Sequence, residues 1–87
     1  MAVVLLPRSL VALFPGTPRR VEANGATVRE VLRDLDARVP GIWDRLCDAG
    51  PVLRAHINVY VAAEPAGLDT PVAADATVHV IPAVSGG

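Results

Sequence analysis

One amphipathic helix, flanked on each side by short apolar segments, most constrains how this chain can fold. Thr27 and Glu30 form a Thr-x-x-Glu capping box, which predicts that a helix begins there. Pro40-Gly41 ends it. Because a helix with a single apolar stripe buries one side, it can cover one face of one sheet. The stripe is formed by residues at i, i+3, i+4 and i+7, namely Val28, Val31, Leu32 and Leu35.

Four segments outside this helix are typical of β-strands. Residues 3–6 form an apolar run that Pro7 interrupts, and residues 20–23 alternate and can pair back on that run. Residues 53–62 alternate throughout, which predicts one long half-buried strand with residues 53, 55, 57, 59 and 61 facing the core. A last strand is predicted for 77–81. The stretch 10–14 is apolar and stops at a Pro-Gly turn. Residues 42–47 suggest a short packed turn, and a loop is expected to follow the strand at 53–62 and to run through residue 71.

The order of these elements predicts an α+β domain. With 87 residues the chain has room for one core, so we expect a mixed sheet of four or five strands packed on one main helix. The right-handed crossover rule sets strands one and three, or one and four, side by side. This is the β-grasp, or ubiquitin-like, arrangement. We expect the domain to span 1–81 and a flexible tail to span 82–87, since Pro82 cannot donate to a ladder.

Composition argues against several classes of partner. The formal net charge is −1 and there are three aromatic side chains, so nucleic acid is not expected as a partner. The first residues lack a basic segment and Pro7-Arg8 interrupts them, so we expect no signal peptide. No apolar run approaches the length of a membrane span. A single cysteine fits a reducing compartment, and the expected location is the cytoplasm with no membrane association.

The sequence closes on Gly86-Gly87, and this pair carries the functional signal. Glycines have no side chains to obstruct a narrow channel, and they adopt backbone angles that other residues resist. The five residues after Pro82 reach about 16 Å when extended. A carboxylate on such a tail can therefore enter the active site of another enzyme and be activated there.

Over essentially its whole length the chain resembles the ThiS/MoaD family of β-grasp sulfur-carrier proteins. The resemblance rests on the first strand, the helix that begins at Thr27 with its apolar stripe, the run INVYV at 57–61 and the ending TVHVIPAVSGG at 77–87. Within the family it is most similar to the CysO-type carriers of cysteine biosynthesis. The resemblance implies that an E1-like enzyme adenylates the Gly87 carboxylate and that sulfur then displaces AMP to leave a thiocarboxylate. The protein would be a co-substrate with no catalytic residue, metal or cofactor of its own.

The resemblance implies two kinds of partner, an E1-like adenylyltransferase/sulfurtransferase and an acceptor enzyme. A cysteine synthase-like acceptor is favoured, and a molybdopterin synthase large subunit is the alternative, in which case this chain would be the small subunit. Sulfur donation to thiamin or a secondary metabolite is a further alternative. A ubiquitin-like modifier joined to lysines through Gly87, or an interaction domain whose terminal glycines are incidental, stays open as well.

Tyr60 and Ile81 are candidates for partner docking. Both fall on the face of the predicted sheet that the helix cannot cover, where exposed apolar groups indicate an interface. Pro82 and Val84 follow on the same segment and are included in the candidate surface.

The remaining chemistry-bearing residues have ordinary structural explanations. Cys47 follows an apolar turn and is expected to be a small buried hydrophobe. His56 and His79 lie on the polar faces of predicted strands, where they are expected to be solvated and to hold no metal, although the two strands can bring them close together. Arg8, Arg19 and Arg20 form a modest basic group that is expected to be solvated.

Overall fold

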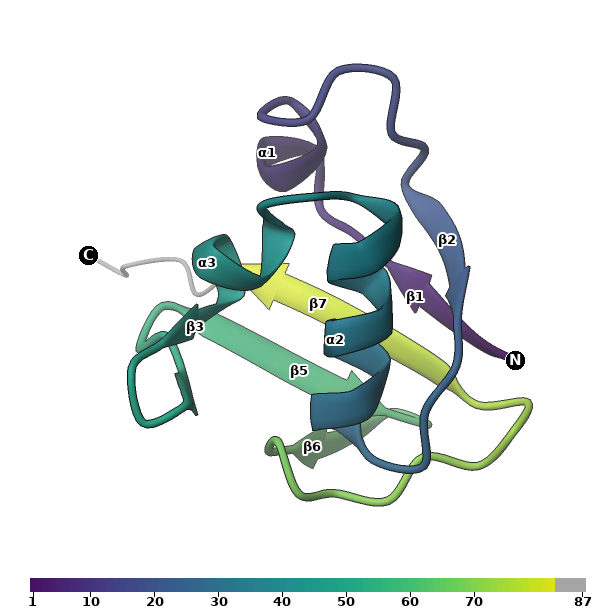
Figure 1. Ribbon diagram of the computed structural model, residues 1–87. Helices are drawn as coiled ribbons and strands as arrows, with labels where there is room; N and C mark the ends of the chain where they lie inside the picture. The colour runs from purple at the N-terminus through teal and green to yellow at the C-terminus, as the bar shows by residue number, and fades with distance from the viewer. Residues whose placement is uncertain (83–87) are drawn as a thin grey trace.

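The computed structural model describes residues 1–82, which form a five-stranded mixed sheet with one long helix, α2 (Val28–Arg38), across one face (Figure 1). The strand order is β2-β1-β7-β5-β6. These strands are β1 (Ala2–Leu5), β2 (Arg20–Ala23), β5 (Ile57–Val61), β6 (Glu64–Ala66) and β7 (Thr77–Pro82).

Two short helices and a small hairpin complete the fold. Helix α1 (Arg8–Val11) follows β1, and helix α3 (Ile42–Leu46) follows α2. A separate two-stranded hairpin comes next, formed by β3 (Cys47–Asp48) and β4 (Val52–Leu53). No helix within residues 1–82 is both long enough and apolar enough to cross a membrane.

The first and last strands pair in parallel at the centre of the sheet. Val4 of β1 lies opposite Val78 of β7, whereas every other pair of neighbouring strands is antiparallel. Of the two arrangements that the crossover rule allows, the structure has strand one beside strand four. The predicted mixed sheet is therefore confirmed.

The start of α2 follows the capping box, with one difference. Thr27 Oγ1 accepts from the Glu30 amide at 3.3 Å, as predicted. The Glu30 carboxylate accepts from the Ala26 amide at 3.1 Å and not, as a standard capping box requires, from the amide of Thr27. The preceding Gly25 lies so close to the first turn that a Cβ there would be 2.4 Å from the Val31 nitrogen. Glycine is thus required for the chain to turn from β2 into α2.

The predicted apolar stripe of α2 is buried without exception. It packs on the inner face of the sheet, where Val4, Val59, Val78 and Val80 are buried as well. All four stripe residues have exposed fractions of 0%: Val28, Val31, Leu32 and Leu35.

The prediction of one continuous strand over 53–62 is wrong. β4 ends at Leu53 and β5 begins at Ile57, because the Ile57 amide donates to the Arg54 carbonyl oxygen at 2.9 Å and closes a turn. Arg54 is held away from the main sheet by its bonds to the carbonyl oxygen of Asp44 and the carboxylate of Asp48. Ala55, expected to face the core, is exposed as a result.

Part of the predicted loop is the fifth strand. β6 pairs with β5 through a two-residue turn in which Val61 lies opposite Glu64. The turn residues Ala62 and Ala63 have φ values of 51° and 69°. These are the left-handed angles that suit the twist of a hairpin but that alanine rarely adopts, so the sequence carries no ordinary signal for this turn.

β7 runs one residue further than predicted, to Pro82. The Ala62 amide donates to the Thr77 carbonyl oxygen, so the backbone groups of Thr77 and alternate residues after it face β5. Pro82 belongs to the other alternating set of β7 residues, whose backbone groups face away from β5, so its nitrogen faces the β1 side. It pairs with Ile57 without needing a donor, because no β1 residue extends that far.

We expect Val31→Asp to unfold the domain. It places an unpaired charge at a fully buried position of α2, at a cost of about 4 kcal/mol or more, which is comparable with the stability of a small domain. The control is Ala37→Asp on the exposed side of the same helix, with an expected cost below about 1 kcal/mol. Thermal unfolding followed by circular dichroism checks both, and a wild-type transition in the Val31 variant would show that the core is misplaced.

Candidate functional site

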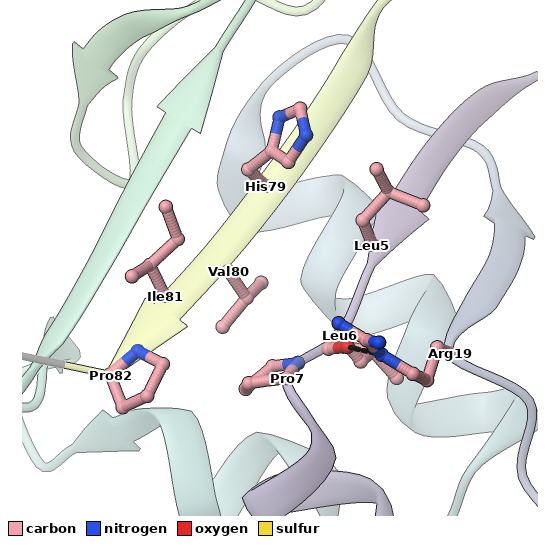
Figure 2. Close-up of a pocket in the computed structure, with 8 residues that line it drawn as sticks. All are labelled: Leu5, Leu6, Pro7, Arg19, His79, Val80, Ile81 and Pro82. Carbon is pink, nitrogen blue, oxygen red and sulfur yellow. Dashed lines mark hydrogen bonds between the residues drawn. The ribbon is translucent and has the colours of Figure 1, made fainter.

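A groove lies where the two parallel strands at the centre of the sheet end side by side. Parallel strands present their carboxyl ends at the same edge, so the end of β1 and the end of β7 meet there. The groove is open and has a volume of about 460 Å³. Figure 2 shows its lining: Leu5, Leu6, Pro7, Arg19, His79, Val80, Ile81 and Pro82.

Arg19 is fixed at the rim of this groove. Its Nε donates to the Leu6 carbonyl oxygen at 3.2 Å, and its own carbonyl oxygen accepts from the Leu6 amide at 2.7 Å (Figure 2). The residue is otherwise exposed. A guanidinium held in this way presents a positive charge beside an apolar groove without losing its contact with water.

Beside the groove, a row of side chains crosses three strands on the outer face of the sheet. Leu5, His79 and Tyr60 lie in one row on β1, β7 and β5. Ile81 lies in the next row, opposite Asn58, and is 44% exposed. This face alternates with the buried one, so it points away from α2.

The structure therefore places Tyr60 and Ile81 on one outer face, on neighbouring strands. Ile81 and Pro82 line the groove, and Tyr60 lies outside it beside His79. Val84, Gly86 and Gly87 lie outside the described residues.

Sequence reasoning missed Leu5, Pro7 and Arg19 as parts of the groove. His79 was expected to be solvated, but it is half-buried in the groove. The signal that finds them is the parallel pairing of the first and last strands.

The two histidines are not close together. His56 lies in the turn before β5, whereas His79 pairs with Tyr60, four residues further along. Four residues of strand correspond to about 13 Å. Within residues 1–82 no three side chains of the His, Cys, Asp and Glu types gather in a way that could hold a metal ion.

Cys47 is buried, as predicted, with 4% of its surface exposed at the start of β3. Burial raises the pKa of its thiol, against smaller opposing effects from nearby arginines. The thiol is thereby kept protonated and weakly nucleophilic. Arg8 and Arg20 are exposed, as expected of a solvated basic group.

We expect Cys47 to react slowly with a thiol-modifying reagent in the folded protein, at least about 100-fold more slowly than a free cysteine. Both its burial and its raised pKa disfavour the thiolate at neutral pH. The check is the rate of modification at pH 7 with and without denaturant, since unfolding removes both effects. Equal rates in the two conditions would contradict a buried thiol.

The fold and the groove together define the chain as a β-grasp protein of the ubiquitin-like class. The protein belongs to the ThiS family, whose model matches residues 4–87.

Known proteins similar to the chain agree with this assignment. It is 37% identical over 78 residues to the sulfur carrier protein CysO of Mycobacterium bovis, covering 83% of this chain and 84% of that protein. A chain in the crystal structure of the Amycolatopsis orientalis BexX/CysO complex matches at 36% identity, with a TM-score of 0.88 and 100% of both chains covered. SAMP1 from Haloferax volcanii matches at 34% identity, with a TM-score of 0.77 and coverage of 99% and 98%.

Proposed function

We propose that this protein is a sulfur carrier that bears a thiocarboxylate at Gly87. One observation carries the proposal: the ThiS family model extends through the sequence to Gly86-Gly87, five residues beyond the end of β7. The likeness to CysO, a sulfur carrier protein, supports the same role.

The chemistry proposed for Gly87 has two steps. An E1-like enzyme joins the carboxylate to AMP from ATP, releasing pyrophosphate, because a free carboxylate is a poor electrophile. A sulfur nucleophile then attacks the acyl carbon and AMP leaves, so that one carboxylate oxygen departs with AMP and sulfur replaces it. The chain contributes no general base to either step and acts as a co-substrate.

The docking surface in this proposal is the groove at the end of β1 and β7 with the outer face beside it. It lies at Pro82, the last described residue before the two glycines, so a partner bound there is next to the segment it acts on. Its apolar lining and the fixed guanidinium of Arg19 suit a partner surface with an apolar centre and an acidic rim.

An acceptor enzyme of cysteine biosynthesis is favoured as the recipient of the sulfur, since the CysO carriers are similar to this chain over most of its length. A second candidate function is conjugation to other proteins through Gly87. The likeness to SAMP1, a small archaeal modifier protein, favours it. All eight basic residues are arginine, so the chain has no lysine on which such a conjugate could be extended.

Deleting Gly87, or adding one residue after it, should abolish charging and leave the fold intact, because the reacting carboxylate is then displaced from its proper position. Intact-mass spectrometry after incubation with an E1-like enzyme, ATP and a sulfur source checks this. The expected wild-type product has one oxygen replaced by one sulfur in its C-terminal peptide. Normal charging of either variant would contradict the proposal, and adducts on lysines of other proteins would favour the modifier.

Ile81→Arg should slow charging about tenfold or more, because it puts a charge at the centre of an apolar docking surface. Ile81 is 44% exposed, so the fold should tolerate the change. The matched control is Leu13→Arg, since Leu13 is 51% exposed and lies outside the groove. The measurement is the initial rate of thiocarboxylate formation, and equal rates for both variants would exclude this docking surface.

A further inference from the structure

The outer edge of the sheet at β2 has no partner in the described structure. The only strand beside β2 among residues 1–82 is β1, and Figure 1 shows β2 at the margin of the sheet. An open edge strand presents unpaired amides and carbonyls, and it pairs readily with another strand. The proposed carrier role does not use this edge.

The hydrogen bonds around β2 show which of its backbone groups face outward. The Arg19 carbonyl oxygen accepts from the Leu6 amide at 2.7 Å, so Arg19 and alternate residues after it face β1. Asn24 belongs to the other alternating set of residues, whose backbone groups face away from β1. Its amide accordingly donates to Asp34 Oδ2 at 2.8 Å. The amides and carbonyls of Arg20 and Glu22 therefore point outward.

The open stretch is short and bounded at both ends. On one side, Pro18 has no amide hydrogen to give. On the other side, the Asn24 amide is already bound to Asp34. Within β2, four outward-facing backbone groups remain for a new strand, two on Arg20 and two on Glu22.

These two residues also make the edge complementary to itself. If a second copy pairs antiparallel about Val21, Arg20 faces Glu22 of the second copy and Glu22 faces its Arg20. Both side chains are exposed, and neither has an ion-pair partner within the part of the chain that the structure describes. A parallel pairing in register would instead place like charges side by side, which destabilises a sheet.

Val21 completes the match at the centre. It is half-buried and lines a shallow hollow with Val39 and Arg38 on the helix side of the edge. In the antiparallel pairing its counterpart is the Val21 of the second copy, at a position where facing side chains lie close together. The apolar contact then covers the hollow from both copies.

We propose that β2 is a self-association edge, through which two copies of this chain form a symmetric antiparallel dimer with one continuous sheet. Four backbone hydrogen bonds, two Arg20–Glu22 ion pairs and one contact between valines hold it. The interface is small, so the dimer is transient and forms at high protein concentration. Such a contact between identical surfaces closes on itself and does not propagate into fibres.

Charge reversal tests the register. In Arg20→Glu both facing pairs become like-charged, and in Glu22→Arg they do too, so each variant should raise the dimer dissociation constant about tenfold or more. The double variant Arg20→Glu/Glu22→Arg restores complementarity and should dimerise as the wild type does. An equimolar mixture of the two single variants should form heterodimers, because each then faces its opposite charge.

Sedimentation velocity from about 10 μM to about 1 mM measures these constants, and thermal unfolding verifies that every variant folds. Amide hydrogen exchange should show protection of Arg20 and Glu22 that rises with protein concentration. A wild type that stays monomeric up to the highest concentration would overturn the proposal and leave the edge to a strand of another protein. Dimerisation of the Arg20→Glu variant at the wild-type constant would overturn it as well.

Discussion

The parallel pairing of β1 with β7 is the contact on which the rest of the molecule depends. It joins the first residues of the chain to the last described ones, so every other element lies in the segment that this pairing closes. α2 must cross the sheet to make the pairing right-handed, and β5 must then add to the free side of β7. The same pairing brings the ends of both strands together, which creates the groove at Pro82. Fold and candidate site thus have one physical origin.

The sequence was sufficient for those parts of the fold that local patterns specify. The stripe on α2 and the capping threonine are local, and the structure confirms both. Three features depended on contacts that no local pattern reveals. The bonds of Arg54 to Asp44 and Asp48 break the alternating segment at 53–62. The turn at Ala62-Ala63 has left-handed angles without glycine or asparagine. The groove needs the long-range pairing of β1 with β7, although Ile81 was predictable from the outer-face alternation.

Two surfaces of the sheet are separated by the strand order. The groove lies over β1 and β7 at the centre, whereas the open edge belongs to β2 on the far side of β1. Association through the edge extends the sheet in its own plane and leaves its outer face uncovered. The proposed carrier and the proposed dimer are therefore compatible in one molecule, because each uses groups that the other does not.

The burial of Cys47 has a chemical consequence for a protein proposed to carry sulfur. It is the one cysteine in the chain, and its thiol is shielded and protonated. A sulfur atom loaded on Gly87 would have no accessible thiol in its own molecule with which to form a mixed disulfide. The loaded sulfur is thereby protected from oxidation to a mixed disulfide with its own protein, and among copies of this protein alone such a bond could form only between two loaded tails. An electrophilic tag applied to the native protein would accordingly report loading directly, without a background signal from the scaffold.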